Sequence, residues 1–367
     1  MPKNNIAISL DEGTEYHNIF KNDSLGLFVR PARTAHFTTH EFPSGTQKII
    51  YGFSLESQNT TEVWHYLIFD TGILVCYNEE FQEIWRLTIA AESANGLPDA
   101  AIGSFTHAVS YNQFIINSEY LTGPIYGYVG GGAILASKVA SINNDTTALD
   151  LLPGSVATFG DRIVYSYYNQ IFINDPGTDP RTIVAENAIA FEGKVLDMFQ
   201  AGPQGNFYVV TTESVYVLPA DGLAGQQSYS GFISRIRNYE GTQLRNCAYS
   251  KGTIFGLVDN GVWDINNSIN IELIKYRRAR KISNPVGNFL DFRYGRVYTY
   301  ENGFIISLGG TSLLIDIVNK FSTWIYSYNL SSKSSEEVVG VLKTRDGKSI
   351  FASQNGVWEF NGNTAVT

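Results

Sequence analysis

Four basic residues stand out in an acidic chain, and they are the first candidates for chemistry. Arg277, Arg278, Arg280 and Lys281 lie close together in a sequence whose net charge is −9. Side chains alternate between the two faces of a strand, so this cluster would place charge on both faces. Such a pattern favours an outer or edge strand, where charge prevents edge-to-edge pairing. A docking patch for an acidic partner is the alternative interpretation.

Histidines and cysteines occur, but not in a spacing that binds metal. His36 and His40 are four residues apart in a strand-like stretch, where that spacing gives no common helical face. Cys76 and Cys247 are isolated, so they form neither a disulfide framework nor a zinc motif. We expect both cysteines to be buried, inert thiols. No metal and no cofactor are predicted.

Enzyme motifs are also missing from the sequence. The carboxylate pairs Glu79–Glu80 and Glu336–Glu337 fall in polar stretches typical of solvated loops. The glycine-rich run Gly127–Gly132 lacks the dinucleotide-binding spacing and is interpreted as a turn. We therefore predict that the chain is not an enzyme. Residues that converge from distant segments leave a carbohydrate-binding or glycosidase-type site open as an alternative.

The composition is that of a β-rich chain with many turns. Of 367 residues, 44% are hydrophobic and 13% aromatic, whereas only 17% are charged, below the usual quarter. No run of a dozen residues has a clean 3.6-residue hydrophobic period, so helices are not predicted. The negative net charge does not fit a protein that holds nucleic acid by its phosphates.

Targeting segments are not evident either. Residues 1–11 lack a charged start followed by an apolar stretch. No apolar run approaches the roughly 18 residues that a membrane-spanning helix needs. We expect a chain that is made in a cytoplasm and carries no membrane anchor.

One seven-residue pattern occurs twice. Asn260–Asn266 reads Asn-Gly-Val-Trp-Asp-Ile-Asn, and Asn355–Asn361 reads Asn-Gly-Val-Trp-Glu-Phe-Asn. Each copy follows a short apolar run, which predicts a strand, a tight Asn-Gly turn and a second strand. Trp263 and Trp358 would then occupy equivalent positions, packed between neighbouring sheets.

Further hairpins recur at a nearly constant spacing. Turn residues that mark them are separated by 44–51 residues, a period typical of β-propeller blades. We therefore predict an all-β chain with a single β-propeller of six to eight blades, seven being the favoured number. The markers are Asn112, Gly160, Gly205, Gly252, Gly303 and Gly347.

Additional strand signals complete the predicted blades. A hairpin is expected around Glu301–Gly303, equivalent to the hairpins of the seven-residue pattern. Strands that follow the hairpins are expected in four segments: Glu83–Ile89, Arg181–Ala185, Ile271–Tyr276 and Thr323–Tyr328.

The two ends of the chain are predicted to close the ring. The last hairpin ends near Asn361, too close to the end of the sequence for another full strand and turn. Its blade would therefore borrow a strand from residues 26–42, which removes exposed edges. Residues 1–25 are interpreted as an N-terminal lead, and residues 26–367 as the propeller domain.

One segment resembles a kelch blade. Gly309–Gly310, Ile315–Asp316 and Trp324 match the kelch Gly-Gly, Tyr-Asp and Trp positions, although Ile315 replaces the tyrosine. Only this one repeat matches. The resemblance implies a protein-interaction propeller as an alternative function.

A broader resemblance is to the tail nozzle or hub proteins of short-tailed bacteriophages, also called packaged-DNA stabilisation proteins. It is carried by the strand Gly26–Pro31 (Gly-Leu-Phe-Val-Arg-Pro) and by the two seven-residue patterns. The resemblance implies a non-enzymatic ring component of the tail that surrounds the DNA channel.

Location and partners are also implied by this resemblance. The protein would be made in the host cytoplasm and become part of the virion tail. Its partners would be an adaptor, a tail fibre or needle, and copies of itself in a homo-hexameric ring. DNA would pass without specific binding.

Overall fold

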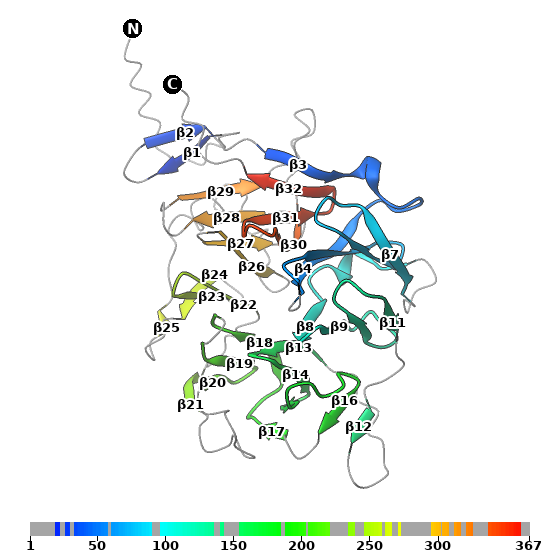
Figure 1. The fold of residues 1–367 in the computed structure, drawn as a ribbon. Coiled ribbons are helices and arrows are strands. Elements are labelled where there is room, and N and C mark those ends of the chain that lie inside the picture. Colours follow the sequence, from blue (N-terminus) through cyan, green and yellow to red (C-terminus); the bar gives the residue numbers. More distant parts are fainter. Residues whose placement is uncertain are drawn as a thin grey trace.

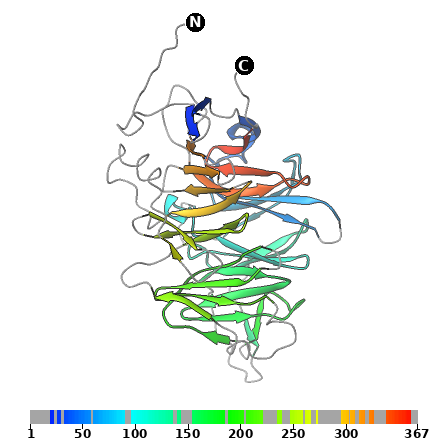
Figure 2. The ribbon, with the colours of Figure 1, turned by 90° about the vertical axis from the view of Figure 1, so that its left-hand side faces the viewer.

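The described strands form seven blades of four antiparallel strands each around a common axis in the computed structural model (Figure 1). The structure describes residues 19–22, 26–29, 33–57, 60–89, 96–135, 140–142, 154–184, 188–202, 205–220, 234–238, 246–258, 261–265, 271–272, 295–301, 303–307, 312–316, 321–325 and 337–360. The chain is therefore a β-propeller of seven blades, as predicted. Figure 2 shows the sheets from the side, stacked one against the next.

Blades 1 to 3 follow one another along the chain, each beginning with its innermost strand. Blade 1 consists of β4 (Ile49–Glu56), β5 (Val63–Phe69), β6 (Ile73–Tyr77) and β7 (Glu83–Thr88). Blade 2 consists of β8 (Thr106–Ser110), β9 (Gln113–Asn117), β10 (Ile125–Tyr128) and β11 (Ala133–Leu135). Blade 3 consists of β13 (Val156–Phe159), β14 (Arg162–Tyr167), β15 (Gln170–Ile173) and β17 (Ala188–Ala190).

Blades 4 to 6 repeat this order. Blade 4 consists of β18 (Val195–Gln200), β19 (Phe207–Thr211), β20 (Ser214–Leu218) and β21 (Ser234–Asn238). Blade 5 consists of β22 (Cys247–Ser250), β23 (Thr253–Val258), β24 (Gly261–Ile265) and β25 (Ile271–Glu272). Blade 6 consists of β26 (Arg296–Tyr300), β27 (Gly303–Ser307), β28 (Ser312–Asp316) and β29 (Phe321–Ile325).

Blade 7 combines both ends of the chain. It contains β30 (Val338–Lys343), β31 (Ser349–Ser353), β32 (Gly356–Phe360) and, as its outermost strand, β3 (Arg33–Thr38). The strand β3 pairs antiparallel with β32, which confirms the predicted closure by a strand from residues 26–42. In addition, β30 meets β4 of blade 1 at Gly340 and Gly52, which joins blades 7 and 1 into one continuous sheet.

Local sequence explains why the strands turn where they do. Between β22 and β23, Lys251 and Gly252 have φ values of +48° and +82°. Two successive positive φ values define the type I′ turn that suits the twist of a hairpin. The second seven-residue pattern forms the β31–β32 hairpin, and the first pattern covers β24.

The hydrophobic core lies between blades. One cluster joins Tyr66 of blade 1 with Phe114 of blade 2, and another joins Phe159 of blade 3 with Phe207 of blade 4. Trp358 packs against a cluster that contains Tyr300 of blade 6, so it lies between blades 6 and 7 as predicted. The side chain of Trp263 lies outside the described residues. Because these apolar side chains are buried only when neighbouring blades pack together, a single blade would not be stable alone.

Two details differ from the sequence predictions. The segment Arg181–Ala185 does not supply the fourth strand of blade 3; β16 (Thr182–Val184) instead pairs in parallel with β12 (Ala140–Ile142). Its Ile183 is buried in the core between blades 2 and 3, a non-local contact that strand propensity cannot reveal. The predicted hairpin at Glu301 is present and joins β26 and β27, but it is the inner pair of blade 6 and is therefore not equivalent to the seven-residue patterns, which lie at the middle pairs of blades 5 and 7.

Blade length also varies more than the predicted 44–51 residues. We compare the separation along the sequence between the first residues of successive innermost strands. This separation is shortest from Val156 to Val195 and longest from Ile49 to Thr106. The predicted period came from turn residues, which lie inside blades. Connections between blades are not held to a fixed length by hairpin geometry.

The predicted N-terminal lead, residues 1–25, includes a strand. β1 (Ile19–Asn22) forms a hairpin with β2 (Gly26–Val29), and Asn22 pairs with Phe321 of β29. The predicted boundary at residue 26 therefore falls inside a hairpin that extends the sheet of blade 6.

Candidate functional site

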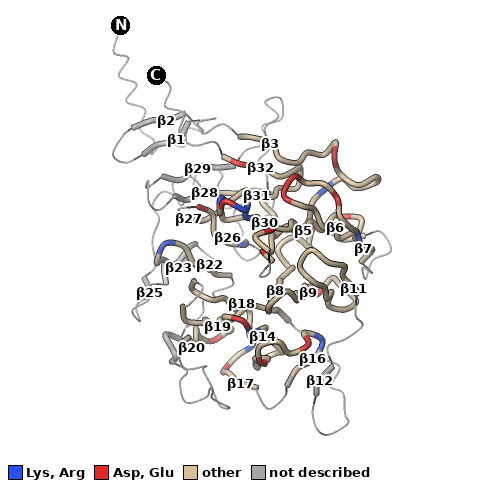
Figure 3. Tube along the Cα trace, in the orientation of Figure 1, with Lys and Arg blue, Asp and Glu red and all other residues tan. Residues whose placement is uncertain are grey.

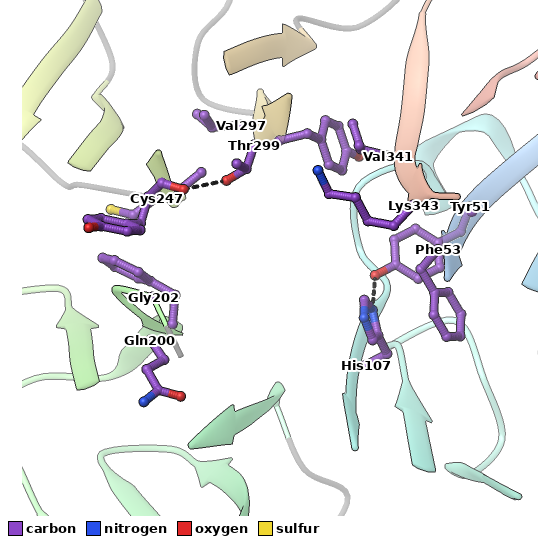
Figure 4. Close-up of a pocket in the computed structure, with 15 residues that line it drawn as sticks. Tyr51, Phe53, His107, Gln200, Gly202, Cys247, Val297, Thr299, Val341 and Lys343 are labelled. Atoms are coloured by element: carbon purple, nitrogen blue, oxygen red, sulfur yellow. Dashed lines mark hydrogen bonds between the residues drawn. The ribbon is translucent and has the colours of Figure 1, made fainter. Parts of the chain in front are cut away.

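A cavity on the propeller axis is the best-defined candidate site. Its volume is about 440 Å³, within the range of small-molecule pockets. Residues of six innermost strands line it: Tyr51 and Phe53 of β4, His107 of β8, Phe199 and Gln200 of β18, Cys247 and Tyr249 of β22, Val297, Tyr298 and Thr299 of β26, and Val341 and Lys343 of β30. Figure 4 shows these side chains around an open centre.

Strand alternation positions many of these side chains. Residues two apart in a strand point to the same side, and four of the strands contribute such a pair. The pairs are Tyr51 and Phe53, Cys247 and Tyr249, Val297 and Thr299, and Val341 and Lys343. The alternation of these pairs can be recognised in the sequence, but the sequence does not indicate which strand of a blade is the innermost.

Tyr51 and His107 connect two neighbouring blades at the cavity wall. The Tyr51 hydroxyl lies 2.7 Å from His107 Nδ1, and the His107 ring stacks on Phe53 with centroids 4.1 Å apart. Burial lowers the pKa of His107 to about 4, so this imidazole is neutral at pH 7. Burial raises the pKa of Tyr51 well above its usual value, which keeps the phenol protonated.

Two cationic side chains lie at or near the cavity. Lys343 Nζ donates a hydrogen bond to Ser349 Oγ, and burial lowers the pKa of this ammonium. In Figure 4 the Lys343 side chain points into the cavity. Arg296, the first residue of β26, packs so closely over Gly103 that a Cβ there would lie 2.8 Å from Arg296 Cγ. None of the described residues that line the cavity is a carboxylate.

A buried carboxylate lies close by, between blades 4, 5 and 6. Asp197 Oδ2 accepts hydrogen bonds from Cys247 N at 2.8 Å and from Asn246 Nδ2 at 3.1 Å. Asn246 Oδ1 in turn accepts one from Val297 N. Burial raises the pKa of Asp197 to about 6, partly opposed by the charge of Arg296 and by the hydrogen bonds. This network links three innermost strands.

Similar contacts recur around the ring. Near the start of the innermost strand, a backbone N–H of one blade donates to the preceding blade, as in Val156 N to Thr106 Oγ1 at 3.1 Å and Val338 N to Ser312 Oγ at 2.8 Å. At two junctions the acceptor is a backbone carbonyl: Val195 N donates to Tyr168 O, and Ile49 N to Gln354 O. Asp197 is therefore one variant of a general link between blades.

The histidines and cysteines behave as structural residues. His36 pairs with Glu359 at 3.0 Å, whereas His40 is exposed. His65 is buried and stacks on Phe81. Both cysteines are free and buried, as predicted, and burial raises their pKa.

One predicted loop carboxylate is buried instead. Glu337 accepts hydrogen bonds from Ser307 Oγ and from Gln354 Nε2. Its position directly before β30 places it under the closing blade, where the two polar donors replace solvent. The sequence shows only a pair of adjacent glutamates.

The remaining sequence candidates cannot be placed. Arg277, Arg278, Arg280 and Lys281 lie outside the described residues. In the part of the chain that is described, no three His, Cys, Asp or Glu side chains come together as metal ligands. That part also contains no helix long and apolar enough to span a membrane.

Comparison with known proteins identifies the fold alone. No protein-family model matches the chain, and no curated protein matches it in sequence. The crystal structure of the RRP9 WD40 repeats is similar with a TM-score of 0.53 at 7% identity, over 89% of this chain and 97% of that one. The extracellular domain of a hybrid two-component system from B. thetaiotaomicron matches with a TM-score of 0.53 at 10% identity.

Coverage differs between these two structures. The match to the B. thetaiotaomicron domain includes 95% of this chain but only 45% of that chain. At such low identities the similarity supports the β-propeller architecture and carries no information on partners or substrates.

Proposed function

We propose that the chain is a non-enzymatic propeller that binds protein partners, and that it forms a ring-shaped nozzle or hub in the tail of a short-tailed bacteriophage. The proposal rests on the β1–β2 hairpin, which adds two strands to a blade that is already complete. In the order of the six-stranded sheet, β2 is the terminal strand. A terminal strand offers backbone N–H and C=O groups to a strand of another chain.

The resemblance to tail nozzle proteins falls on this hairpin. Four of the six residues from Gly26 to Pro31 that carry it form β2. An edge strand outside the ring is suited to lateral contact between copies, as assembly into a homo-hexameric ring would require. An adaptor and a tail fibre or needle are the further partners that we propose, with the virion tail as the location.

Charge and dimensions are compatible with this role. Figure 3 shows lysine, arginine, aspartate and glutamate positions scattered along the described chain. An axial cavity of about 440 Å³ holds a small molecule and not a duplex. DNA would therefore pass through a ring of copies and not through the axis of one propeller. The net charge of −9 would discourage binding of the phosphates.

Deletion of residues 1–32 tests the proposal because it removes β1 and β2 but keeps β3. The full chain is expected to form rings in electron micrographs, alone or with tail fractions. The truncated chain is expected to keep its melting temperature and to remain monomeric.

Two results would contradict the proposal. One is a full-length chain that stays monomeric and binds no virion component. The other is recovery of a single soluble, non-virion partner in a pull-down, which would favour the kelch-like interaction propeller.

A further inference from the structure

The axial cavity presents hydrogen-bond donors without matching acceptors. Tyr51 and a neutral His107 carry two exchangeable protons between them, one on the phenol and one on the ring. Their mutual hydrogen bond uses only one of these protons. Whichever tautomer His107 adopts, one O–H or N–H of the pair is left over. No other described side chain bonds to either residue.

Lys343 adds a charged donor to the same wall. Its ammonium has three protons, and Ser349 Oγ accepts one of them. Among the described residues, no carboxylate oxygen lies within salt-bridge distance of Lys343 Nζ. The charges that act on it are those of Glu301 and Lys251, which oppose one another. The Lys343 residue is exposed, so its remaining ammonium protons are accessible to a ligand in the cavity that it lines.

The opposite wall is aromatic. Phe199 stacks on Tyr208 with an interplanar angle of 7°, and Thr299 Oγ1 donates to Tyr249 O, which ties β22 to β26. Tyr249 lines the cavity alongside Phe199, whereas Tyr298 packs against the buried cluster between blades 6 and 7. Aromatic rings held in this way offer flat surfaces for an apolar or planar molecule.

We propose that the axial cavity is a binding site for a small organic carboxylate. The carboxylate accepts hydrogen bonds from Lys343 Nζ and from the spare donor of the Tyr51–His107 pair, and its body lies against the rings of Phe199 and Tyr249. Charge-assisted hydrogen bonds of this kind are about twice as strong as neutral ones. The site belongs to the single propeller, so it does not depend on whether the chain assembles into a tail.

Benzoate is a suitable probe because it combines a carboxylate with one flat ring. Isothermal titration calorimetry of the full chain would compare benzoate with benzyl alcohol and benzylamine, which share its shape but are neutral and cationic. We expect one benzoate per chain and binding at least about tenfold weaker for the other two.

Three variants locate the site. Lys343→Met is expected to weaken benzoate binding about tenfold or more, and Tyr51→Phe several-fold. Lys343→Arg keeps the positive charge and is expected to retain benzoate binding. If Lys343→Met does not fold, Tyr51→Phe and Lys343→Arg still test whether the donors of the cavity bind the carboxylate. Lys348→Met is the matched control, because the Lys348 side chain is 61% exposed, pairs with Asp346 and does not line the cavity. Its benzoate affinity should equal that of the original chain.

Several outcomes would overturn the proposal. They are the absence of benzoate binding at millimolar concentration, equal affinity for benzyl alcohol, and an unchanged affinity in both Lys343→Met and Tyr51→Phe. Each would show that the donors of the cavity do not recognise a carboxylate.

Discussion

Two regions where blades meet differ in the chemistry of their buried groups. Where blade 7 meets blade 1, the buried contact is apolar: Gly340 abuts Gly52, and Phe37, Ile49 and Leu342 share one buried cluster. The polar contacts of this junction are exposed, such as Lys343 N to Ser54 Oγ. Where blades 4, 5 and 6 meet, an apolar cluster between blades 4 and 5 is joined by the buried polar network around Asp197.

Chain connectivity differs between the two regions. Blades 4 to 6 follow one another along the chain, whereas blade 7 is complete only when β3, which continues through residues 39–48 into β4 of blade 1, pairs with β32. That pairing is non-covalent, and apolar burial supplies a large, non-directional driving force for it. The polar junction tolerates a buried carboxylate because Asp197 has its hydrogen-bond donors in place.

Removing the closing strand should have the largest effect. Deletion of residues 1–45 removes β3 and Phe37, leaving the edge of β32 exposed and part of the shared core empty. We expect loss of the cooperative thermal transition or aggregation, measured by circular dichroism and size-exclusion chromatography. Deletion of residues 1–32 is the control. A monomeric, fully folded product of the longer deletion would reject closure by β3.

A single methyl group should disturb the apolar junction strongly. A Cβ at Gly340 would lie 1.8 Å from Gly52 O, so the two strands must move apart. We expect Gly340→Ala to lower the free energy of unfolding by about 3 kcal/mol in urea denaturation. Gly132→Ala adds the same methyl group where no atom lies within 4 Å, and should change stability by less than about 0.5 kcal/mol. Equal effects would mean that the Gly340–Gly52 approach is not tight.

The two junctions should respond to pH in opposite directions. The folded pKa of Asp197 is about 6, above its unfolded value of about 3.9, so its contribution is full below pH 4 and lost as pH rises through 6. The folded pKa of His65 in blade 1, lowered mainly by burial, is about 4, below an unfolded value of about 6.5. Its contribution is present above pH 6.5 and lost as pH falls through 4.

Each of these two pKa shifts changes the free energy of unfolding by about 3 kcal/mol at most. Unfolding free energies measured between pH 4 and 7 should therefore separate the two groups. Relative to the original chain, Asp197→Asn should become more stable as pH rises, and His65→Gln should become more stable as pH falls. Parallel curves for the original chain and either variant would contradict the assigned titration.

Loss of one polar link should have the smallest effect. Asn246→Ala leaves Val297 N without its acceptor and removes one donor from Asp197, which should cost about 2 kcal/mol. Thr106→Val removes a single neutral acceptor, that of Val156 N, and should cost about 1 kcal/mol. If both variants cost the same in urea denaturation, the three-blade network adds nothing to a simple hydrogen bond.

Much of the architecture could be predicted because hairpins are local. An Asn-Gly or Lys-Gly turn and the alternating residues around it specify two paired strands within about a dozen residues. The repeat of such units therefore indicated a seven-bladed propeller. The predicted closure by a strand from residues 26–42 is confirmed by the pairing of β3 with β32.

The candidate site could not be predicted in the same way. Tyr51, His107 and Lys343 come from three blades, and their meeting depends on which strand of each blade is innermost. The pairing of β16 with β12 and the burial of Glu337 are likewise non-local. No sequence pattern distinguishes a glutamate that will be solvated from one that will accept two buried hydrogen bonds.

The sequence by itself determined the strands, the turns and the number of blades, since these depend on residues that are close along the chain. Only the tertiary structure decided which side chains face the axis, which carboxylate is buried and where β16 pairs. These features depend on contacts between residues far apart in the chain, and closure of the ring brings them together.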